Sequence, residues 1–447
     1  MTSQEKPAGT RAGTTKKKAT GSNGGQLRRV AIIGGNRIPF ARSNGPYADA
    51  SNQDMLTAAI DGLVSRYSLQ GERLGEVAAG AVLKHARDFN LVRECVLGSA
   101  LSAQTPASDV QMACGTGLQA IVNLANKIAL GQIDSAIGGG VDTTSDAPLA
   151  VNDDLRKLLV QLNAARSTGD RIKLLGKIRP GHIVPEIPQN SEPRTGMSMG
   201  EHAARTAKAW GIGREEQDKL AATSHQRLAA AYDRGFFDDL VTSYLKQSRD
   251  QNLRADSTAD KLAKLKPVFG GSDGTMTAGN STPLSDGAST VLLATEEWAK
   301  ARNLPVLAYL TFAQTGAVDY VHGDEGLLMA PTYAVPRMLE RAGLNLQDFD
   351  FYEIHEAFAS QVLSTLKAWD DTEFAKDKLG LDTAPGAIDR DKLNVNGSSL
   401  AAGHPFAATG GRITATLAKL LAEQGSGRGL ISICAAGGQG ITAILER

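Results

Sequence analysis

A cysteine in a glycine-bearing turn is the first feature of this sequence that could do chemistry. Cys114 lies in Met-Ala-Cys-Gly-Thr-Gly, between a short strand pattern and an amphipathic helical pattern that ends near Gly131. A thiol there would face the free N–H groups at the start of the helix, which favour the thiolate and are expected to lower the thiol pKa. The alternative is a buried cysteine with a structural role only, which is the commoner fate of a lone cysteine.

Three further reactive side chains in the C-terminal half favour the catalytic interpretation. His355 begins His-Glu-Ala-Phe-Ala, His404 lies in Ala-Gly-His-Pro, and Cys434 begins Cys-Ala-Ala-Gly-Gly-Gln-Gly. Each follows a strand pattern or lies in a glycine-rich turn, and in open α/β sheets ligands bind beyond the carboxyl ends of strands. Taken singly, each has a structural alternative: a histidine bound to a backbone carbonyl, a histidine that orients a loop, and a thiol in the core.

The composition excludes several classes of protein. The chain has 447 residues, which indicates two or three domains. Lys+Arg and Asp+Glu are both 48, and no basic run is interleaved with aromatic residues, so we expect no nucleic-acid partner. An odd count of 3 cysteines without paired spacing argues against disulfides and for a reducing cytoplasm. No ligand spacing predicts a metal, and no apolar run is long enough for a transmembrane helix.

The chain order predicts two α/β halves with an insertion. Residues 28–146 alternate buried strands with helices, which predicts a mainly parallel, covered sheet. Residues 147–284 break this alternation and form the predicted inserted loop domain, after which residues 285–303 complete the first half. Residues 304–447 form a second half that mirrors the first. Residues 1–27 lack the apolar core of a signal peptide and are predicted to be a disordered tail.

The insertion contains a basic amphipathic stretch. Between residues 155 and 179 there are seven basic side chains and one acidic side chain. Apolar residues of the same stretch share one helical face: Leu155, Leu158, Leu159, Leu162 and Ala165. Two interpretations stay open: a surface helix packed on its own domain, and a surface that binds a membrane or a partner subunit.

The motifs around Cys114, His404 and Cys434 resemble, in the same order, the three signature blocks of the thiolases, which make or cleave 3-oxoacyl-CoA. The resemblance covers about residues 28–447. Within the family, the His355-Glu-Ala-Phe motif and the basic insertion are similar to the thiolase subunit of the trifunctional fatty-acid β-oxidation complex. Many other thiolases have Asn where this chain has His355.

This resemblance implies an α/β fold of two similar halves in five layers, αβαβα, and a role for each reactive residue. Cys114 would attack the 3-keto carbonyl and hold the acyl group as a thioester. His404 would take the thiol proton, and Cys434 would protonate the departing acetyl-CoA carbanion. His355 and His404 would stabilise the enolate oxygen. The backbone N–H groups of Cys114 and Ala436 would form a second oxyanion hole, although many thiolases have Gly at the position of Ala436.

The resemblance also implies contacts with CoA and with other proteins. CoA is a substrate, so no resident cofactor is expected. Arg254 matches a position beside the adenine, Thr282 one beside the pantetheine arm, and Met199 one that lines the same pocket; Arg254 could equally be a solvated surface charge. A homodimer or larger oligomer is expected. Two alternatives stay open: a standalone homo-oligomer, and a complex in which residues 155–179 bind a hydratase/dehydrogenase α subunit or a membrane surface.

The function predicted from the sequence is thiolysis of 3-oxoacyl-CoA by CoA in fatty-acid β-oxidation, through an acyl-Cys114 intermediate. One alternative is a short-chain acetyl-CoA C-acetyltransferase, which would make or degrade acetoacetyl-CoA at the same site. The alternative from another class is a non-catalytic acyl-CoA-binding protein with the same fold.

Overall fold

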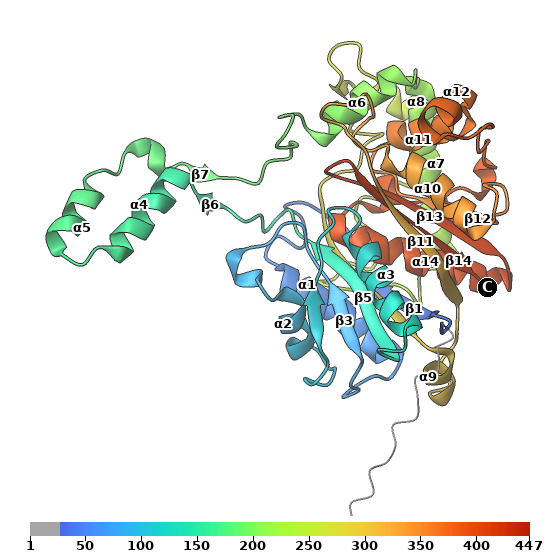
Figure 1. Cartoon of the computed structure of the whole chain (residues 1–447), viewed down its shortest axis with the longest axis horizontal. Helices are drawn as coiled ribbons and strands as arrows, with labels where there is room; N and C mark the ends of the chain where they lie inside the picture. The colour runs from blue at the N-terminus through green and yellow to red at the C-terminus, as the bar shows by residue number, and fades with distance from the viewer. Residues whose placement is uncertain (1–26) are drawn as a thin grey trace, which may run out of the picture.

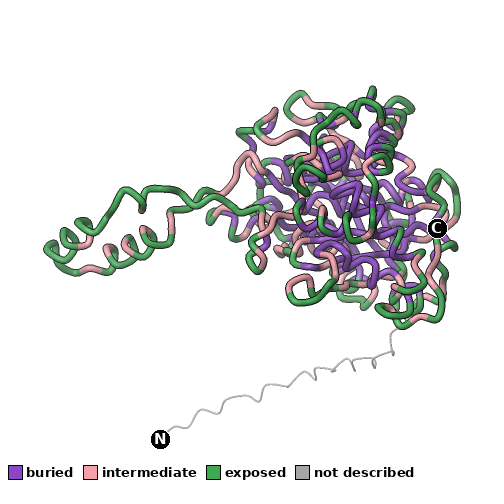
Figure 2. Tube along the Cα trace, turned by 90° about the horizontal axis from the view of Figure 1, so that it is seen from above, coloured by how far each residue is buried: buried purple, intermediate pink, exposed green. Residues whose placement is uncertain are grey.

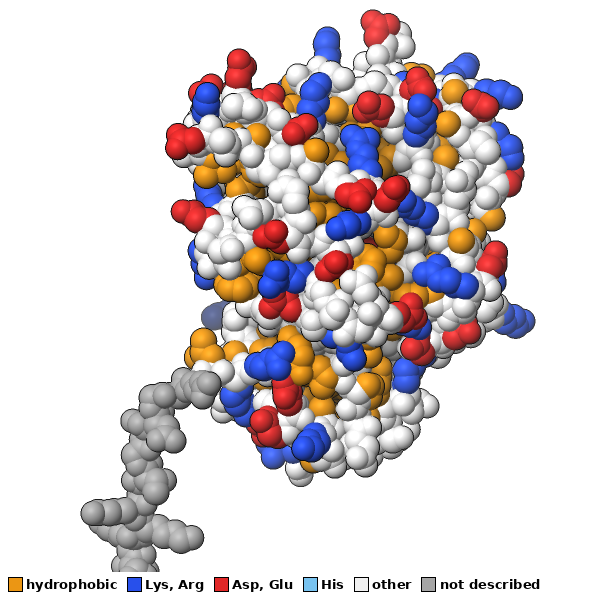
Figure 3. Space-filling model, turned by 90° about the vertical axis from the view of Figure 1, so that its right-hand side faces the viewer, with side chains coloured by type: hydrophobic (Ala, Val, Ile, Leu, Met, Phe, Trp, Pro, Cys, Tyr) orange, Lys and Arg blue, Asp and Glu red, His pale blue; other side chains and the backbone are white. Residues whose placement is uncertain are grey.

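The computed structural model describes residues 27–447. Residues 1–26, which make up nearly all of the predicted disordered tail, lie outside the described residues. The described chain has a main body from which one long arm projects (Figure 1). On the side of the body opposite the arm, acidic and basic side chains are interspersed (Figure 3). No helix between residues 27 and 447 has the length and apolar character needed to cross a membrane.

A single sheet runs through both halves in the order β12-β13-β14-β11-β1-β10-β5-β3-β4, and the short β2 also pairs with β10. The first half contributes β1 (Ala31–Arg37), β2 (Ala41–Arg42), β3 (Glu76–Ala79), β4 (Ala107–Asp109), β5 (Ser135–Asp142) and β10 (Ser285–Ala294). The second half contributes β11 (Ala308–Ala317), β12 (Phe351–Ile354), β13 (Arg428–Ala435) and β14 (Gln439–Glu446). The two halves join where β1 pairs with β11, at Ala31 with Tyr309 and Ile32 with Ala308.

The expectation of a mainly parallel sheet is wrong. Parallel pairing is confined to β3 with β4, β3 with β5, and β12 with β13, whereas the other main pairs are antiparallel. Two connections explain the difference. After β5 the chain leaves the sheet for the insertion and returns in β10, which runs antiparallel beside β5. The strands β13 and β14 form a hairpin, whose turn uses Gly437 and Gly438 at φ +79° and +70°.

The helices complete the five predicted layers, and the predicted α/β fold is confirmed. In the first half α1 (Asn52–Arg66) and α2 (Leu91–Gly98) cover the outer face of the strands. In the second half α10 (Ala330–Ala342) and α11 (Ala359–Asp370) cover the outer face. Between the two sets of strands lie α3 (Thr116–Ala129) and α14 (Thr409–Gln424), in one shared core (Figure 1).

The N-termini of α3 and α14 meet at two glycines. A Cβ atom on Gly410 would lie 2.1 Å from the backbone N of Leu118, and one on Gly117 would lie 2.5 Å from the carbonyl O of Ala407. Only glycine permits this approach. Because α3 starts two residues after Cys114 and α14 starts five residues after His404, the same contact brings those two side chains together.

The remaining elements are short or belong to the insertion. Part of the insertion packs on the second half through α6 (Met199–Ala209), α7 (Arg214–Asp233) and α8 (Ala259–Leu262). Its hairpin consists of β8 (Pro267–Phe269) and β9 (Met276–Thr277). The other helices are α9 (Glu296–Ala301), α12 (Thr372–Phe374) and α13 (Ser399–Ala402). Single helical turns occupy Ala86–Asp88, Pro180–Ile183, Ala375–Leu379, Arg390–Lys392 and Phe406–Ala408.

The arm is the part of the insertion that carries the basic stretch. Its stem is the pair β6 (Ala150–Val151) and β7 (Pro185–Glu186), and its tip holds α4 (Asp153–Ala164) and α5 (Thr168–Leu175). Neither tip helix has a buried residue, and the arm extends away from the body in both views (Figures 1 and 2). The interpretation of this stretch as a helix packed on its own domain is therefore wrong.

Candidate active site

Cys114 occupies a tight turn directly before α3. The preceding residue, Ala113, has φ +45°, a left-handed backbone that residues other than glycine rarely adopt. The Thr116 hydroxyl closes this turn, because it donates to the Ala113 carbonyl at 2.7 Å and accepts from the Met112 N–H at 2.8 Å. These bonds fix the position of the residue that carries the thiol.

His404 is held with one ring nitrogen against that thiol. It follows Gly403, whose φ is +103° and where a Cβ atom would lie 2.4 Å from Asn252 Nδ2. The ring Nδ1 is 2.6 Å from Oγ1 of Thr409, and Nε2 is 3.1 Å from Sγ of Cys114. When Nδ1–H donates to Thr409, the free Nε2 accepts from the thiol, which is the arrangement of a nucleophile and its base.

The electrostatics of this pair differ from the expectation for a helix N-terminus. Burial raises the pKa of the Cys114 thiol to about 12, while hydrogen bonds from the backbone N–H groups of Ala436 and of Cys114 itself oppose the rise. Burial, and then the charge of Arg412, lower the pKa of His404 to about 3. The expectation of a lowered thiol pKa is therefore wrong, because desolvation outweighs the helix N-terminus.

His355 lies beside His404 at the end of β12. Its backbone N–H donates to the carbonyl of Ser432 at 2.8 Å, and its ring centroid is 4.1 Å from that of His404. The ring Nδ1 is 2.7 Å from Oγ of Ser399. The ring Nε2 is buried and has no hydrogen-bond partner among residues 27–447. A buried polar atom without an internal partner is available to a ligand.

Cys434 is the second thiol of the site. Its side chain is buried at the end of β13, and burial raises its pKa far above the ordinary value, as does negative charge on Cys114. The two thiols are thus close enough for the charge of one to disfavour ionisation of the other. Cys434 is therefore a protonated thiol at neutral pH, which suits it to donate a proton.

The turn after Cys434 is anchored by a residue that the sequence did not indicate. Glu192, in the insertion, accepts from the N–H of Gly437 at 2.6 Å and from the Tyr320 hydroxyl at 2.9 Å. This anchor stands next to Ala436, whose own N–H is directed at the Cys114 sulfur. Glu192 has no distinctive spacing to the motifs, so nothing in the sequence could have indicated it.

A second positioning residue, Glu356, was also missed. Glu356 accepts from the Ser224 hydroxyl at 2.7 Å, from Asn394 Nδ2 at 2.8 Å and from the Leu400 N–H at 3.1 Å. It thereby ties the His355 loop to α13. The sequence signal for Glu356 is its place directly after His355, because a polar residue next to a reactive one often supports it.

The structure brings the predicted reactive residues together. A ring nitrogen of each histidine, His355 and His404, and the sulfur of Cys114 all lie within 4.8 Å of one another. These are ligand atoms of the kind that zinc accepts, so the absence of a metal stays a prediction. The hydrogen bond from thiol to imidazole supports acyl chemistry at this cluster.

The three candidate CoA contacts have different surroundings. Thr282 bonds through its N–H and its hydroxyl to the carbonyl of Ala357, at 3.1 and 2.9 Å, two residues after His355. Met199 is half-buried and packs against the apolar cluster that contains Cys434. Arg254 is exposed, and its backbone N–H donates to a ring nitrogen of His225 at 3.2 Å. Their contact with CoA stays a prediction.

Comparison with known proteins shows similarity over nearly the whole chain. The family described as "Thiolase, N-terminal domain" matches residues 30–297, and "Thiolase, C-terminal domain" matches residues 304–447. The 3-ketoacyl-CoA thiolase of Yersinia pestis (strain Pestoides F) is 41% identical over 424 residues, which cover 94% of this chain and 97% of the relative.

Two solved structures are similar over nearly the whole chain. The acetyl-CoA acetyltransferase of Bacillus anthracis has a TM-score of 0.78 at 29% identity, covering 94% of this chain and 99% of its own. The human mitochondrial 3-ketoacyl-CoA thiolase has a TM-score of 0.77 at 30% identity, covering 94% and 100%. The human enzyme is similar to the same extent in its complex with CoA, with a TM-score of 0.77.

Proposed function

This chain belongs to the thiolase family, and we propose that it cleaves 3-oxoacyl-CoA with CoA, giving acetyl-CoA and a shortened acyl-CoA in fatty-acid β-oxidation. The observation that carries this proposal is the 3.1 Å contact between His404 Nε2 and Cys114 Sγ, with the thiol of Cys434 in the same site. A nucleophile and base alone would serve many acyl transfers. A second, protonated thiol suits cleavage of a carbon–carbon bond, because the departing carbanion needs a proton.

The first half of the reaction forms the acyl-enzyme. The Cys114 sulfur attacks the 3-keto carbon of the substrate, and its proton passes to Nε2 of His404. The bond between C2 and C3 then breaks, and its electron pair leaves with acetyl-CoA as an enolate. The enolate oxygen would accept hydrogen bonds from the two histidines, His355 and His404. Cys434 gives its proton to C2 and is left as a thiolate.

The second half transfers the acyl group to CoA. The incoming CoA thiol gives its proton to the Cys434 thiolate, and its sulfur attacks the thioester carbon on Cys114. The tetrahedral oxyanion would be held by the backbone N–H groups of Cys114 and Ala436, and both already donate toward the Cys114 sulfur. When the acyl bond breaks, Cys114 recovers its proton from His404, so the enzyme is restored.

CoA would bind between the insertion and the two halves. Thr282 and Met199 would contact the pantetheine chain of CoA, because both lie close to reactive residues. Thr282 bonds to Ala357, two residues after His355, and Met199 packs against the apolar cluster that contains Cys434. The exposed guanidinium of Arg254 would contact the adenine end. This proposal is supported by the human mitochondrial 3-ketoacyl-CoA thiolase, whose structure was solved with CoA.

A short-chain acetyltransferase is the second candidate, favoured by the similarity to the Bacillus anthracis acetyl-CoA acetyltransferase. The deciding experiment is CoA-dependent cleavage of acetoacetyl-CoA and of a long-chain 3-oxoacyl-CoA by the purified chain. We expect a higher kcat/KM for the long chain. Preference for acetoacetyl-CoA would favour the acetyltransferase, and cleavage of neither would favour a non-catalytic acyl-CoA-binding protein.

The variant Cys114→Ala is the matched control for that assay. It should bind CoA as the wild type does, because the thiol is not part of the CoA site, while losing thiolysis altogether. Turnover by Cys114→Ala equal to that of the wild type would contradict the proposal.

The arm is proposed to bind a partner, as in the thiolase subunit of a trifunctional β-oxidation complex. Of the eighteen exposed large hydrophobic side chains between residues 27 and 447, eight lie in the arm and two directly flank its stem. These are Leu149, Val151, Leu159, Val160, Ile172, Leu175, Ile178, Ile183, Val184 and Ile187. Together with the basic side chains of residues 155–179, this surface suits a hydratase/dehydrogenase subunit or an anionic membrane.

Charge reversal on the arm tests this proposal. The double variant Lys173→Glu, Lys177→Glu should lose co-sedimentation with such a subunit or with anionic vesicles. A control that makes the same charge change on the body is Lys300→Glu, Lys376→Glu, at two exposed lysines. Equal binding by both double variants would contradict a role for the arm.

We also propose that the chain forms a homodimer or larger oligomer and works in the cytoplasm. Analytical sedimentation of the purified chain measures the oligomer.

A further inference from the structure

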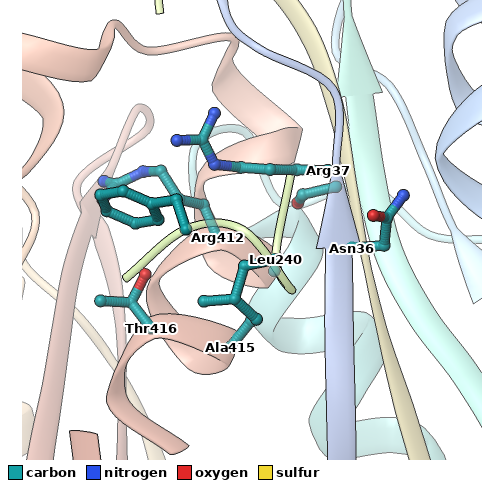
Figure 4. Close-up of a pocket in the computed structure, with 9 residues that line it drawn as sticks. Asn36, Arg37, Leu240, Arg412, Ala415 and Thr416 are labelled. Carbon is teal, nitrogen blue, oxygen red and sulfur yellow. The ribbon is translucent and has the colours of Figure 1, made fainter. Parts of the chain in front are cut away.

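A buried arginine, Arg412, is connected to His355 through the hydroxyl of Ser399. Arg412 extends from α14 beside a small cavity that Arg37 also lines (Figure 4). Arg37 is paired with Asp250 at 2.6 Å, whereas Arg412 forms no ion pair with any residue from 27 to 447. The Arg412 Nη2 instead donates to Oγ of Ser399 at 2.8 Å. Ser399 is the residue whose hydroxyl contacts Nδ1 of His355.

The hydrogen-bond inventory at Ser399 fixes the direction of each bond. A hydroxyl has one hydrogen to donate, and a guanidinium can only donate, so Arg412 occupies a lone pair of Ser399 Oγ. The other polar neighbour of this hydroxyl in the described chain is His355 Nδ1, at 2.7 Å. If Nδ1 carried the hydrogen, the buried Ser399 hydroxyl would have no acceptor, which is costly. The hydroxyl therefore donates to Nδ1, and the ring hydrogen lies on Nε2.

We propose that Arg412, acting through Ser399, holds His355 in its neutral Nε2–H tautomer and so makes it a hydrogen-bond donor within the site. Arg412 and Ser399 are positioning residues in this proposal, because neither contacts the reacting atoms. Burial and the nearby charges of His404 and Arg412 lower the pKa of His355 well below its ordinary value, so the ring stays neutral. Its Nε2 atom is the one left without an internal partner.

The two neighbouring histidines then have complementary functions. His404 presents an unprotonated Nε2 to the Cys114 thiol, whereas His355 presents an N–H. That this N–H donates to the thioester oxygen rests on the proposed function. The His355 hydrogen stays on Nε2 throughout, so the enolate is stabilised without a proton transfer from His355, and the proton for C2 still comes from Cys434.

Nitrogen NMR of the full chain, labelled with ¹⁵N in its histidine rings, tests the tautomer without any substrate. The variant His355→Asn assigns the signals of His355 by their loss. In the wild type, Nε2 of His355 should have the shift of a protonated ring nitrogen and Nδ1 that of an unprotonated one. The reverse assignment in the wild type would overturn the proposal.

Three variants separate positioning from packing. Ser399→Ala removes the donor to Nδ1 and should give mixed tautomers, whereas Ser399→Thr keeps the hydroxyl and the wild-type spectrum. Arg412→Gln should also give mixed tautomers, because an amide oxygen can accept the Ser399 hydrogen. If Arg412→Gln does not fold, the two Ser399 variants decide. Identical spectra for Ser399→Ala and the wild type would overturn the proposal.

Kinetics of the Ser399 variants provide a second measurement. Ser399→Ala should lower kcat about 10- to 100-fold and leave the KM for CoA nearly unchanged, because the lost donor acts on the reacting oxygen. Ser399→Thr should restore most of kcat. The NMR result does not require turnover. An Nε2–H tautomer in an enzyme without thiolase activity would therefore refute the proposed function and leave the positioning role intact.

Discussion

His404 Nε2 and Cys114 Sγ are 3.1 Å apart, and burial removes the charge from both. The thiol has a pKa of about 12 and the imidazole one of about 3, so the resting pair is a neutral thiol and a neutral imidazole. A preformed ion pair of thiolate and imidazolium would need the opposite shifts. The thiol is therefore expected to ionise only as it attacks, when substrate and the backbone N–H groups of the site can stabilise the charge that develops.

Alkylation of Cys114 by iodoacetamide should reflect this neutral pair. Because only the thiolate reacts, the rate should rise with pH across about pH 6 to 9 without a plateau. The measurement is mass spectrometry of the peptide that contains Cys114, after timed exposure in the absence of substrate. A plateau near neutral pH would indicate a lowered pKa and contradict the dominance of burial.

The Cys434→Ser variant should separate the two chemical steps. A hydroxyl is a much weaker acid than a thiol, so proton transfer at C2 should slow by about 10²- to 10⁴-fold, and condensation and thiolysis with it. Acylation of Cys114 by acetyl-CoA should persist, and acetyl-enzyme should be detectable by intact mass. The control is Cys95→Ser. Cys95 lies in α2, in the apolar core on the outer face of the first half, so this variant should keep wild-type turnover. Failure to trap acetyl-enzyme in Cys434→Ser would contradict this division of roles.

Glu192→Gln should disturb the turn after Cys434. Glutamine keeps one acceptor oxygen but places an amide NH₂ where the carboxylate accepts from either Gly437 or Tyr320. We expect a stability loss of about 0.5–1.5 kcal/mol, because one partly exposed donor loses its acceptor, and a kcat lowered about tenfold. Tyr320→Phe removes only the hydroxyl bond and should leave kcat within about twofold. Chemical denaturation and steady-state kinetics measure both effects, and an equal kcat loss in the two variants would place the anchor at Tyr320 instead.

The sequence was sufficient for the α/β class of the fold, and the family resemblance implied its five layers. The motifs also predicted reactive residues, of which the structure brings Cys114, His355 and His404 together, while their catalytic roles stay a prediction. Cys114, His355, His404 and Cys434 stand at strand ends or glycine turns, where short motifs carry strong local signals. The order of strands and helices likewise predicted two α/β halves. These features depend on residues close together in the chain, which is why they could be recognised without a structure.

Features that depend on distant contacts could not be predicted. Glu192 reaches Gly437 across 245 positions, and no local pattern marks it. The direction of β10 depends on how the insertion returns to the sheet. The amphipathic pattern of α4 is the same whether the helix packs on the body or projects in an arm. The prediction of a lowered pKa for the Cys114 thiol was wrong because the local sequence shows the helix N-terminus but not the burial that opposes its effect.

Glu353, in β12, should make stability depend on pH. Both of its carboxylate oxygens are buried without a hydrogen-bond partner among the described residues, and burial raises its pKa to about 8 despite the opposing charge of Arg412. Unfolded glutamate ionises near its ordinary pKa of 4.5. Between these two values the folded state holds a proton that the unfolded state has released. The resulting stabilisation is complete at low pH and is lost as pH rises toward the folded-state pKa.

Glu353→Gln removes this titration while keeping the shape of the protonated side chain. The free energy of unfolding of the variant, relative to wild type, should therefore increase by about 1.4 kcal/mol per pH unit between about pH 4.5 and 8, and then level off. Urea denaturation of both proteins at a series of pH values measures the difference. The matched control is Glu340→Gln, at an exposed glutamate of α10, which should follow the wild-type profile. A constant difference between Glu353→Gln and wild type would show that Glu353 ionises alike in the folded and unfolded chain, with Arg412 compensating the burial of its charge.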